Sequence, residues 1–313
     1  MDYLKSPIVK EKPNVKWSEI AGLEDAKNSL KESVVLPIRF PQIFTGSMSS
    51  FISQAILLYG PPGTGKSFLA KAAATEAGNS TFFSISLLDL LTKWSLESQN
   101  FIISLFEMAR QQQPSILFID QIEALCSYEN EIDSDNARIT KTEFLCQMDI
   151  LRKKKDNIIV LGVTNFPWCL DSPIMKRFNR MVYFPLPELE EREKIFKLFL
   201  EMSPHYLTSQ DFLELGKRSE GYSGSDISIV VQNARIQSYG SIQEDAVKPS
   251  RESAETNLSE SCIPFSEEKF LNSEKIFNSK ITMNGMLNAL STHKPTLDEN
   301  YLEKIKNFSS PYF

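Results

Sequence analysis

The sequence predicts an α/β protein with a parallel sheet covered by helices on both faces, followed by a small helical domain. Over the first part of the chain, short apolar segments alternate with amphipathic ones. Right-handed crossovers between parallel strands place helices on both faces of such a sheet. From Pro185 to Pro187 the alternation stops, and only helical periodicity follows. We therefore expect a large domain over residues 1–187 and a small helical domain over residues 188–313.

Composition excludes several classes of protein. The 313 residues are 42% hydrophobic and 24% charged, the balance of a folded globular chain. The net charge of −6, from 34 basic and 40 acidic residues, disfavours nucleic acid as a partner. No window approaches the roughly 18 apolar residues of a membrane helix, and the N-terminal residues contain no signal-peptide core. We expect a cytoplasmic protein that contacts membranes only indirectly.

The elements of the large domain follow from the spacing of apolar residues. The first 20 residues predict an extended arm. Three- and four-residue spacing from Leu23 to Val34 predicts a helix that ends at Pro37. Continuous apolar runs predict buried strands at residues 55–59, 82–86, 116–119 and 158–163. Helical spacing predicts intervening helices at residues 67–77, 101–109 and 141–148.

The small domain is expected to contain helices interrupted by one irregular segment. Apolar stripes at helical spacing occupy residues 195–202 and 227–234. Residues 241–280 are rich in serine and charged side chains, which predicts a long irregular insertion. A last stripe after Pro295 predicts a C-terminal helix. Its apolar positions are Tyr301, Leu302, Ile305 and Phe308.

Residues 60–67, Gly-Pro-Pro-Gly-Thr-Gly-Lys-Ser, match the pattern G-x-x-x-x-G-K-[ST] between a predicted strand and a predicted helix. The glycines let backbone N–H groups turn toward an anion, and the helix N-terminus adds partial positive charge. We expect Lys66 to bind the β and γ phosphates of ATP and Ser67 to bind Mg²⁺. A glycine-rich turn without a ligand is the alternative. The residues expected to contact the nucleotide are Pro62, Gly63, Thr64, Gly65, Lys66, Ser67 and Phe68.

A second motif, Ser-Ile-Leu-Phe-Ile-Asp at residues 115–120, ends an apolar strand on a carboxylate. Ligands of parallel sheets collect at the carboxyl ends of the strands. Asp120 is therefore expected to bind the metal, directly or through water. A helix cap is the alternative role for Asp120, and the upstream phosphate loop disfavours it.

These motifs together resemble the AAA+ ATPases, within the branch that contains katanin, spastin, fidgetin and vacuolar protein sorting-associated protein 4. The matching segments are residues 14–24, 80–84, 162–165 and 221–227. Three further segments resemble the sorting ATPase type, namely residues 36–41, 141–145 and 294–296. The resemblance implies a P-loop NTPase fold with a parallel five-stranded sheet and a small helical domain. The N-terminal microtubule-interacting-and-transport domain of that type has no counterpart in this sequence.

The resemblance also implies a function. Members of the sorting type form hexameric rings or spirals that pull ESCRT-III filaments apart, so we expect an ATPase recruited to endosomal membranes. It implies a homo-oligomer, or a hetero-oligomer with an active paralogue, and an activating cofactor at the small domain. Microtubule severing is the alternative in this branch. Basic filament tails are favoured over acidic tubulin tails by an acidic run of Glu129, Glu131, Asp133 and Asp135.

The family's motifs imply roles for further residues. Asn165 would be the polar sensor that positions the attacking water, with capping of the next turn as the alternative. Lys176 and Arg177 occupy the position of two arginines that reach the γ-phosphate of a neighbouring subunit. The residues implied to flank the adenine are Ala21, Gly22, Gly224 and Ser225.

The family's first pore loop, whose aromatic residue grips the threaded polypeptide, falls at Lys93 and Trp94. Packing in the core or at an interface is the alternative for Trp94. Leu96 stands where the family has glycine, which should reshape this loop. A second pore loop is expected near residues 128–138.

Two departures concern the chemistry. Gln121 stands where the family has the glutamate that polarises the attacking water, and an amide cannot accept the proton. General-base catalysis contributes about 10²- to 10⁴-fold in rate, so we expect ATP binding with impaired hydrolysis. Lys176 replaces one arginine, and its ammonium group cannot bind a phosphate through two parallel hydrogen bonds as a guanidinium group does. A non-hydrolysing, ATP-bound subunit that holds its substrate is therefore the alternative to an active ATPase.

Overall fold

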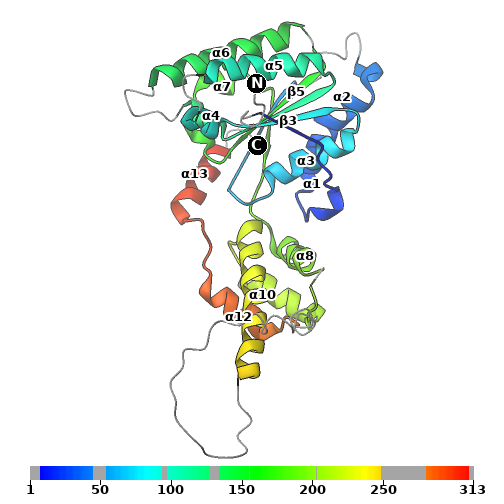
Figure 1. The fold of residues 1–313 in the computed structure, drawn as a ribbon, viewed down its shortest axis with the longest axis vertical. Coiled ribbons are helices and arrows are strands. Elements are labelled where there is room, and N and C mark those ends of the chain that lie inside the picture. The colour runs from blue at the N-terminus through cyan, green and yellow to red at the C-terminus, as the bar shows by residue number, and fades with distance from the viewer. Residues whose placement is uncertain are drawn as a thin grey trace, which may run out of the picture. The chain divides into compact units, whose positions relative to one another are not determined.

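The computed structural model describes residues 8–44, 54–93, 97–126, 134–154, 156–201, 203–247 and 280–309. The chain folds into two compact units (Figure 1). The first comprises Met1–Pro187 together with Leu297–Phe313, and the second comprises Glu188–Thr296. Each unit has its own hydrophobic core and is described by itself.

The C-terminal helix α13 (Glu299–Ser309) belongs to the first unit, whereas the sequence analysis places it in the small domain. Aromatic packing explains the difference. The ring of Phe308 lies 5.5 Å from that of Tyr59, and the ring of Tyr301 lies 5.2 Å from that of Trp168, measured between centroids. The apolar stripe that predicted this helix therefore covers the large α/β unit.

The first unit is built on a six-stranded sheet with the strand order β1-β3-β4-β5-β2-β6. Strands β2 to β6 are parallel, and β1 pairs antiparallel with β3, Val9 opposite Ser84. The sheet has one strand more than the five expected, because part of the arm pairs with the edge of β3. The strands are β1 (Val9–Glu11), β2 (Ala55–Tyr59), β3 (Thr81–Ser86), β4 (Ser115–Asp120), β5 (Ile158–Thr164) and β6 (Arg180–Tyr183).

Helices cover both faces of this sheet, which confirms the α/β fold (Figure 1). In β2, Leu57 faces the core under α4 to α7, whereas Ile56 and Leu58 face the core under α1 to α3. The helices are α1 (Glu24–Leu30), α2 (Leu36–Arg39), α3 (Lys66–Ala77), α4 (Leu87–Lys93), α5 (Ser98–Gln111), α6 (Ser134–Lys154) and α7 (Ser172–Met175). Short 3₁₀ turns lie at η2 (Trp17–Glu19), η4 (Pro41–Phe44), η6 (Ile122–Leu125) and η7 (Pro167–Cys169).

The prediction that Pro37 ends the first helix is wrong. A π-helical segment, η3 (Lys31–Val35), joins α1 to α2, and Pro37 lies in the first turn of α2. The chain keeps right-handed helical dihedrals through Val35 and Leu36, and the π-helical segment before Pro37 is where the helix accommodates the missing N–H.

The second unit is helical, with a core formed by α8 (Leu189–Leu200), α9 (Ser209–Arg218), α10 (Gly224–Val247) and α12 (Met283–Thr292). Helix α10 continues to Val247, so residues 241–247 are helical rather than part of the expected insertion. Most of that insertion lies outside the described residues. An isolated β-bridge pairs His205 with Ile281, and Ile281 is part of this core.

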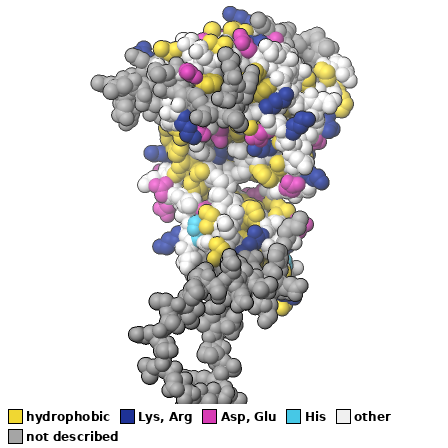
Figure 2. All heavy atoms as spheres, in the orientation of Figure 1, with side chains coloured by type: hydrophobic (Ala, Val, Ile, Leu, Met, Phe, Trp, Pro, Cys, Tyr) yellow, Lys and Arg dark blue, Asp and Glu magenta, His cyan; other side chains and the backbone are white. Residues whose placement is uncertain are grey.

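Lys and Arg side chains are scattered among Asp and Glu over the face in Figure 2. Within the ranges that the structure describes, no helix has the length and apolarity of a membrane span.

Candidate functional site

The loop from Gly60 to Ser67 joins the end of β2 to the start of α3. Its glycines have positive φ angles, +145° at Gly60, +75° at Gly63 and +94° at Gly65. A Cβ at Gly60 would lie 2.3 Å from the carbonyl oxygen of Phe184. The hydroxyl of Thr64 donates to the carbonyl of Pro61 at 2.8 Å and closes the turn. This conformation requires glycine at Gly60, for steric as well as torsional reasons.

Lys66 is the buried cation of this loop. Its side chain is 5% exposed, and Nζ donates to the carbonyl oxygens of Gly60 at 2.8 Å and Pro61 at 2.6 Å. Burial lowers the pKa of Lys66 to about 7, although the charges of Asp120 and Glu123 oppose the shift. Burial disfavours the charged form of Lys66, and the two carboxylates only partly offset this effect. An anionic ligand would stabilise the ammonium group further, so the loop suits such a ligand.

Asp120 ends β4 opposite Ser86, the last residue of β3. Burial raises the pKa of Asp120, against a 2.9 Å hydrogen bond from the Gln121 backbone N–H and the charge of Lys66. A bound cation would favour the ionised carboxylate. With the half-buried hydroxyl of Ser67, Asp120 supplies the oxygen ligands that Mg²⁺ prefers.

Gln121 follows Asp120 in the left-handed region, with φ of +55°. Its Oε1 accepts a hydrogen bond of 2.9 Å from the hydroxyl of Ser86. The side chain is therefore held at the carboxyl end of the sheet beside β3. Its carbonyl oxygen accepts one hydrogen bond there, and the side chain offers no carboxylate.

Glu123, which lies on the turn η6, was not predicted as a site residue. This side chain is 9% exposed, and its Oε1 accepts a 3.4 Å hydrogen bond from the backbone N–H of Asn165, directly after β5. The signal was an acidic residue two positions after Gln121, in the segment Asp-Gln-Ile-Glu. The structure thus brings Lys66, Asp120, Gln121 and Asn165 to one edge of the sheet, with Glu123 among them.

Tyr301 of α13 was predicted only as an apolar helix position. Its hydroxyl donates to the carbonyl of Asn165, and the carbonyl oxygen of Gly60 lies 3.4 Å from the same hydroxyl as a second acceptor. Two segments of the candidate site thus share a donor from the far end of the chain. The available signal was a hydroxyl-bearing side chain in a stripe whose other members, Leu302, Ile305 and Phe308, are purely hydrocarbon.

Comparison with known proteins places these features in a family. The model of the ATPase family associated with various cellular activities (AAA) matches residues 56–186. Vacuolar protein sorting-associated protein 4A of Homo sapiens is 44% identical over 325 residues, covering 99% of this chain and 74% of that protein. Protein 4B of Mus musculus is 46% identical over 323 residues, covering 99% and 72%. The chain belongs to the AAA ATPases.

Solved AAA structures agree with this assignment. The FIGL-1 AAA domain in complex with ADP matches with a TM-score of 0.78 and 30% identity, covering 97% of this chain and 92% of that one. A katanin structure concerned with self-assembly matches with a TM-score of 0.74 and 30% identity, covering 97% and 94%. The resemblance to the katanin, fidgetin and sorting-ATPase branch is therefore confirmed, and the chain is an ATPase.

The other positions implied by the AAA resemblance lie in separate places. Leu23, next to Ala21 and Gly22, lies beside the loop, because a Cβ at Gly65 would have Leu23 Cδ1 at 4.0 Å. Arg177 forms an ion pair of 2.8 Å with Asp149 on α6.

Three predicted site positions are exposed to solvent. Lys176 and Phe68 are exposed, and Lys93 pairs with Asp89 at 2.8 Å. Trp94, Leu96 and most of the segment 128–138 lie outside the described residues.

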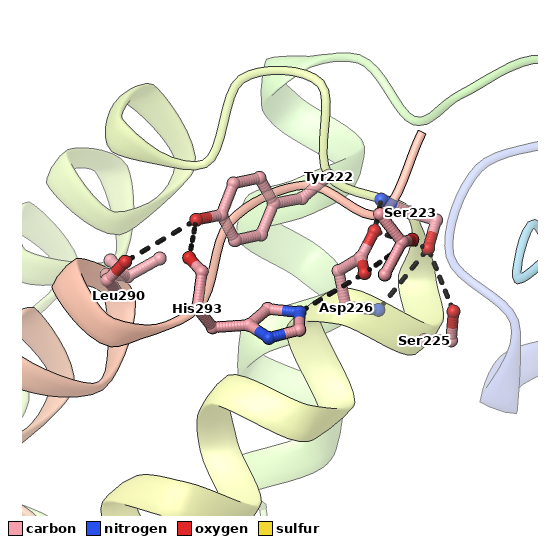
Figure 3. A network of polar contacts seen from close by, with 7 residues as sticks. Tyr222, Ser223, Ser225, Asp226, Leu290 and His293 are labelled. Atoms are coloured by element: carbon pink, nitrogen blue, oxygen red, sulfur yellow. Dashed lines mark hydrogen bonds and ion pairs between the residues drawn. The ribbon is translucent and has the colours of Figure 1, made fainter. Parts of the chain in front are cut away.

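Gly224 and Ser225 begin α10 in the second unit, beside a buried polar network (Figure 3). Its centre is Asp226, fully buried, whose carboxylate accepts from Ser223, from Thr296 at 2.9 Å and from the ring of His293 at 3.2 Å. Burial acts to raise the pKa of Asp226, but these hydrogen bonds outweigh it and hold the pKa below its ordinary value. The network fixes the start of α10, where Gly224 and Ser225 lie.

Proposed function

We propose that this AAA ATPase binds ATP with Mg²⁺ at the loop of residues 60–67 and hydrolyses it slowly. Lys66 would bind the β and γ phosphates, and Ser67 and Asp120 would hold the metal, which neutralises charge on the phosphate oxygens when bound. Ala21 and Gly22, and in the second unit Gly224 and Ser225, are proposed to flank the adenine. The lowered pKa of buried Lys66 supports an anionic ligand.

Slow hydrolysis is proposed to follow from the glutamine at position 121. The presence of Gln121 in place of a glutamate is the observation that carries this proposal. A water molecule beside Gln121 can be oriented by the amide, but the amide cannot take its proton. Oε1 accepts from Ser86 at 2.9 Å, which fixes the orientation of the amide. Loss of a general base costs about 10²- to 10⁴-fold in rate. Asn165 is proposed to orient the attacking water. Arg177 is proposed to reach the nucleotide of a neighbouring subunit.

The substrate is proposed to be a protein filament of the ESCRT-III type at endosomal membranes, disassembled by a homo-oligomeric or hetero-oligomeric ring. Identity of 44–46% with vacuolar protein sorting-associated proteins 4A and 4B supports this choice. Katanin-type microtubule severing is the second candidate, supported by the structural match to katanin. Co-sedimentation in ATP with ESCRT-III filaments and, separately, with microtubules distinguishes the two.

The proposed chemistry is tested by phosphate release from the chain and from Gln121→Glu. We expect the variant to release phosphate at least about 10²-fold faster. Gln232→Glu, at an exposed position of α10, is the matched control and should leave the rate unchanged. Equal rates for the chain and Gln121→Glu would contradict the proposed role of position 121.

A further inference from the structure

Tyr301 lies where three parts of the first unit meet. Its ring contacts Phe166 and Trp168 edge-on, at centroid separations of 5.9 and 5.2 Å. Its hydroxyl donates to the carbonyl of Asn165, and the carbonyl of Gly60 lies 3.4 Å away. Helix α13 therefore contacts the first residue of the phosphate loop and the residue that follows β5.

The hydroxyl of Tyr301 acts as a neutral donor. Burial raises its pKa, and the nearby Tyr183 and Glu123 raise it further, so the proton is retained at neutral pH. A hydroxyl of this kind can move its single hydrogen between two carbonyl acceptors by rotation about the C–O bond. Asn165 and Gly60 provide those two acceptors.

The carbonyl of Gly60 has a second donor, the ammonium group of Lys66. Lys66 Nζ lies 2.8 Å from it and 2.6 Å from the carbonyl of Pro61. If Lys66 binds phosphate as proposed, its ammonium group turns from these carbonyls toward the ligand. Gly60 is buried, so its carbonyl then needs another donor.

We propose that Tyr301 is a positioning residue, whose hydroxyl takes over the carbonyl of Gly60 when Lys66 turns to the nucleotide. The nucleotide-bound loop and the docked helix α13 then stabilise each other. Because such coupling is reciprocal, nucleotide binding tightens the docking of α13, and a docked α13 raises nucleotide affinity. This inference rests on the proposed phosphate site.

The test compares the chain with Tyr301→Phe, which keeps the ring and removes only the hydroxyl. A Mg²⁺ complex of fluorescent ADP is titrated into both. The substitution removes the donor to the half-buried Asn165 in the free chain and the donor to the buried Gly60 in the bound chain. An unpaired carbonyl costs more at the buried position, so the Kd should rise by up to about five-fold. Tyr206→Phe, at an exposed position of the second unit, is the matched control and should leave the Kd unchanged.

Hydrogen exchange gives a second measurement, which does not depend on global stability. In the chain, nucleotide should slow amide exchange in α13, and in Tyr301→Phe this protection should be lost. Equal Kd values together with equal protection in both proteins would overturn the inference. Failure of the unaltered chain to bind nucleotide would instead overturn the proposed phosphate site.

Discussion

Replacing Lys66 with methionine should remove a pH dependence from the stability of the first unit. The pKa of Lys66 is lowered by burial from 10.5 to about 7. Between these two values the unfolded chain binds more protons at this lysine than the folded chain does. Stability therefore rises with pH across this window. From pH 7 to pH 9 the gain from Lys66 alone is about 2 kcal/mol, since one pKa unit corresponds to about 1.4 kcal/mol.

Urea unfolding at pH 7 and pH 9 measures this gain. All three tryptophans lie in the first unit, so their fluorescence reports its unfolding. The free energy of unfolding of the chain should increase by about 2 kcal/mol more than that of Lys66→Met between the two pH values. Lys153→Met, at an exposed position of α6, is the matched control and should keep the full increase. An identical increase in the chain and in Lys66→Met would refute the reasoning.

Two substitutions test other parts of the structure. Gly60→Ala places a Cβ 2.3 Å from the carbonyl oxygen of Phe184 at a φ of +145°, so the first unit should lose more than about 2 kcal/mol in urea unfolding. Unchanged stability would show that Phe184 can move aside. Asp226→Ala removes the shared acceptor of Ser223, His293 and Thr296, which should destabilise the second unit by about 2–4 kcal/mol. Faster hydrogen exchange in α10 and α12 would report this loss, and unaltered exchange would contradict it.

The sequence predicted the parallel sheet because its central strands β2, β4 and β5 are continuous apolar runs that the fold buries. Residues of β2 such as Ile56 and Leu57 face opposite cores, so both must be apolar. The predicted loop likewise joins β2 to α3, because its pattern of glycines, lysine and serine is tied to one local geometry. In both cases the local sequence pattern was sufficient to predict the structure.

Features that depend on distant partners were not predicted. Strand β1 is three residues long and exists through its pairing with β3. The placement of α13 in the first unit depends on ring contacts to Tyr59 and Trp168, which are distant in sequence. Glu123 is part of the candidate site because η6 turns it toward Asn165. Such contacts are set by tertiary packing, and a linear pattern does not contain them.

The charges at the carboxyl edge of the sheet offer a reason why glutamine is tolerated at position 121. Lys66 interacts there with two carboxylates, Asp120 and Glu123, and burial still lowers its pKa to about 7. A glutamate at position 121 would add a third negative charge beside Asp120, and like charges at close range disfavour ionisation. Gln121 keeps the hydrogen bond to Ser86 without this repulsion. With Gln121 the edge of the sheet carries less like charge and lacks a carboxylate that could take a proton, which agrees with the slow turnover proposed above.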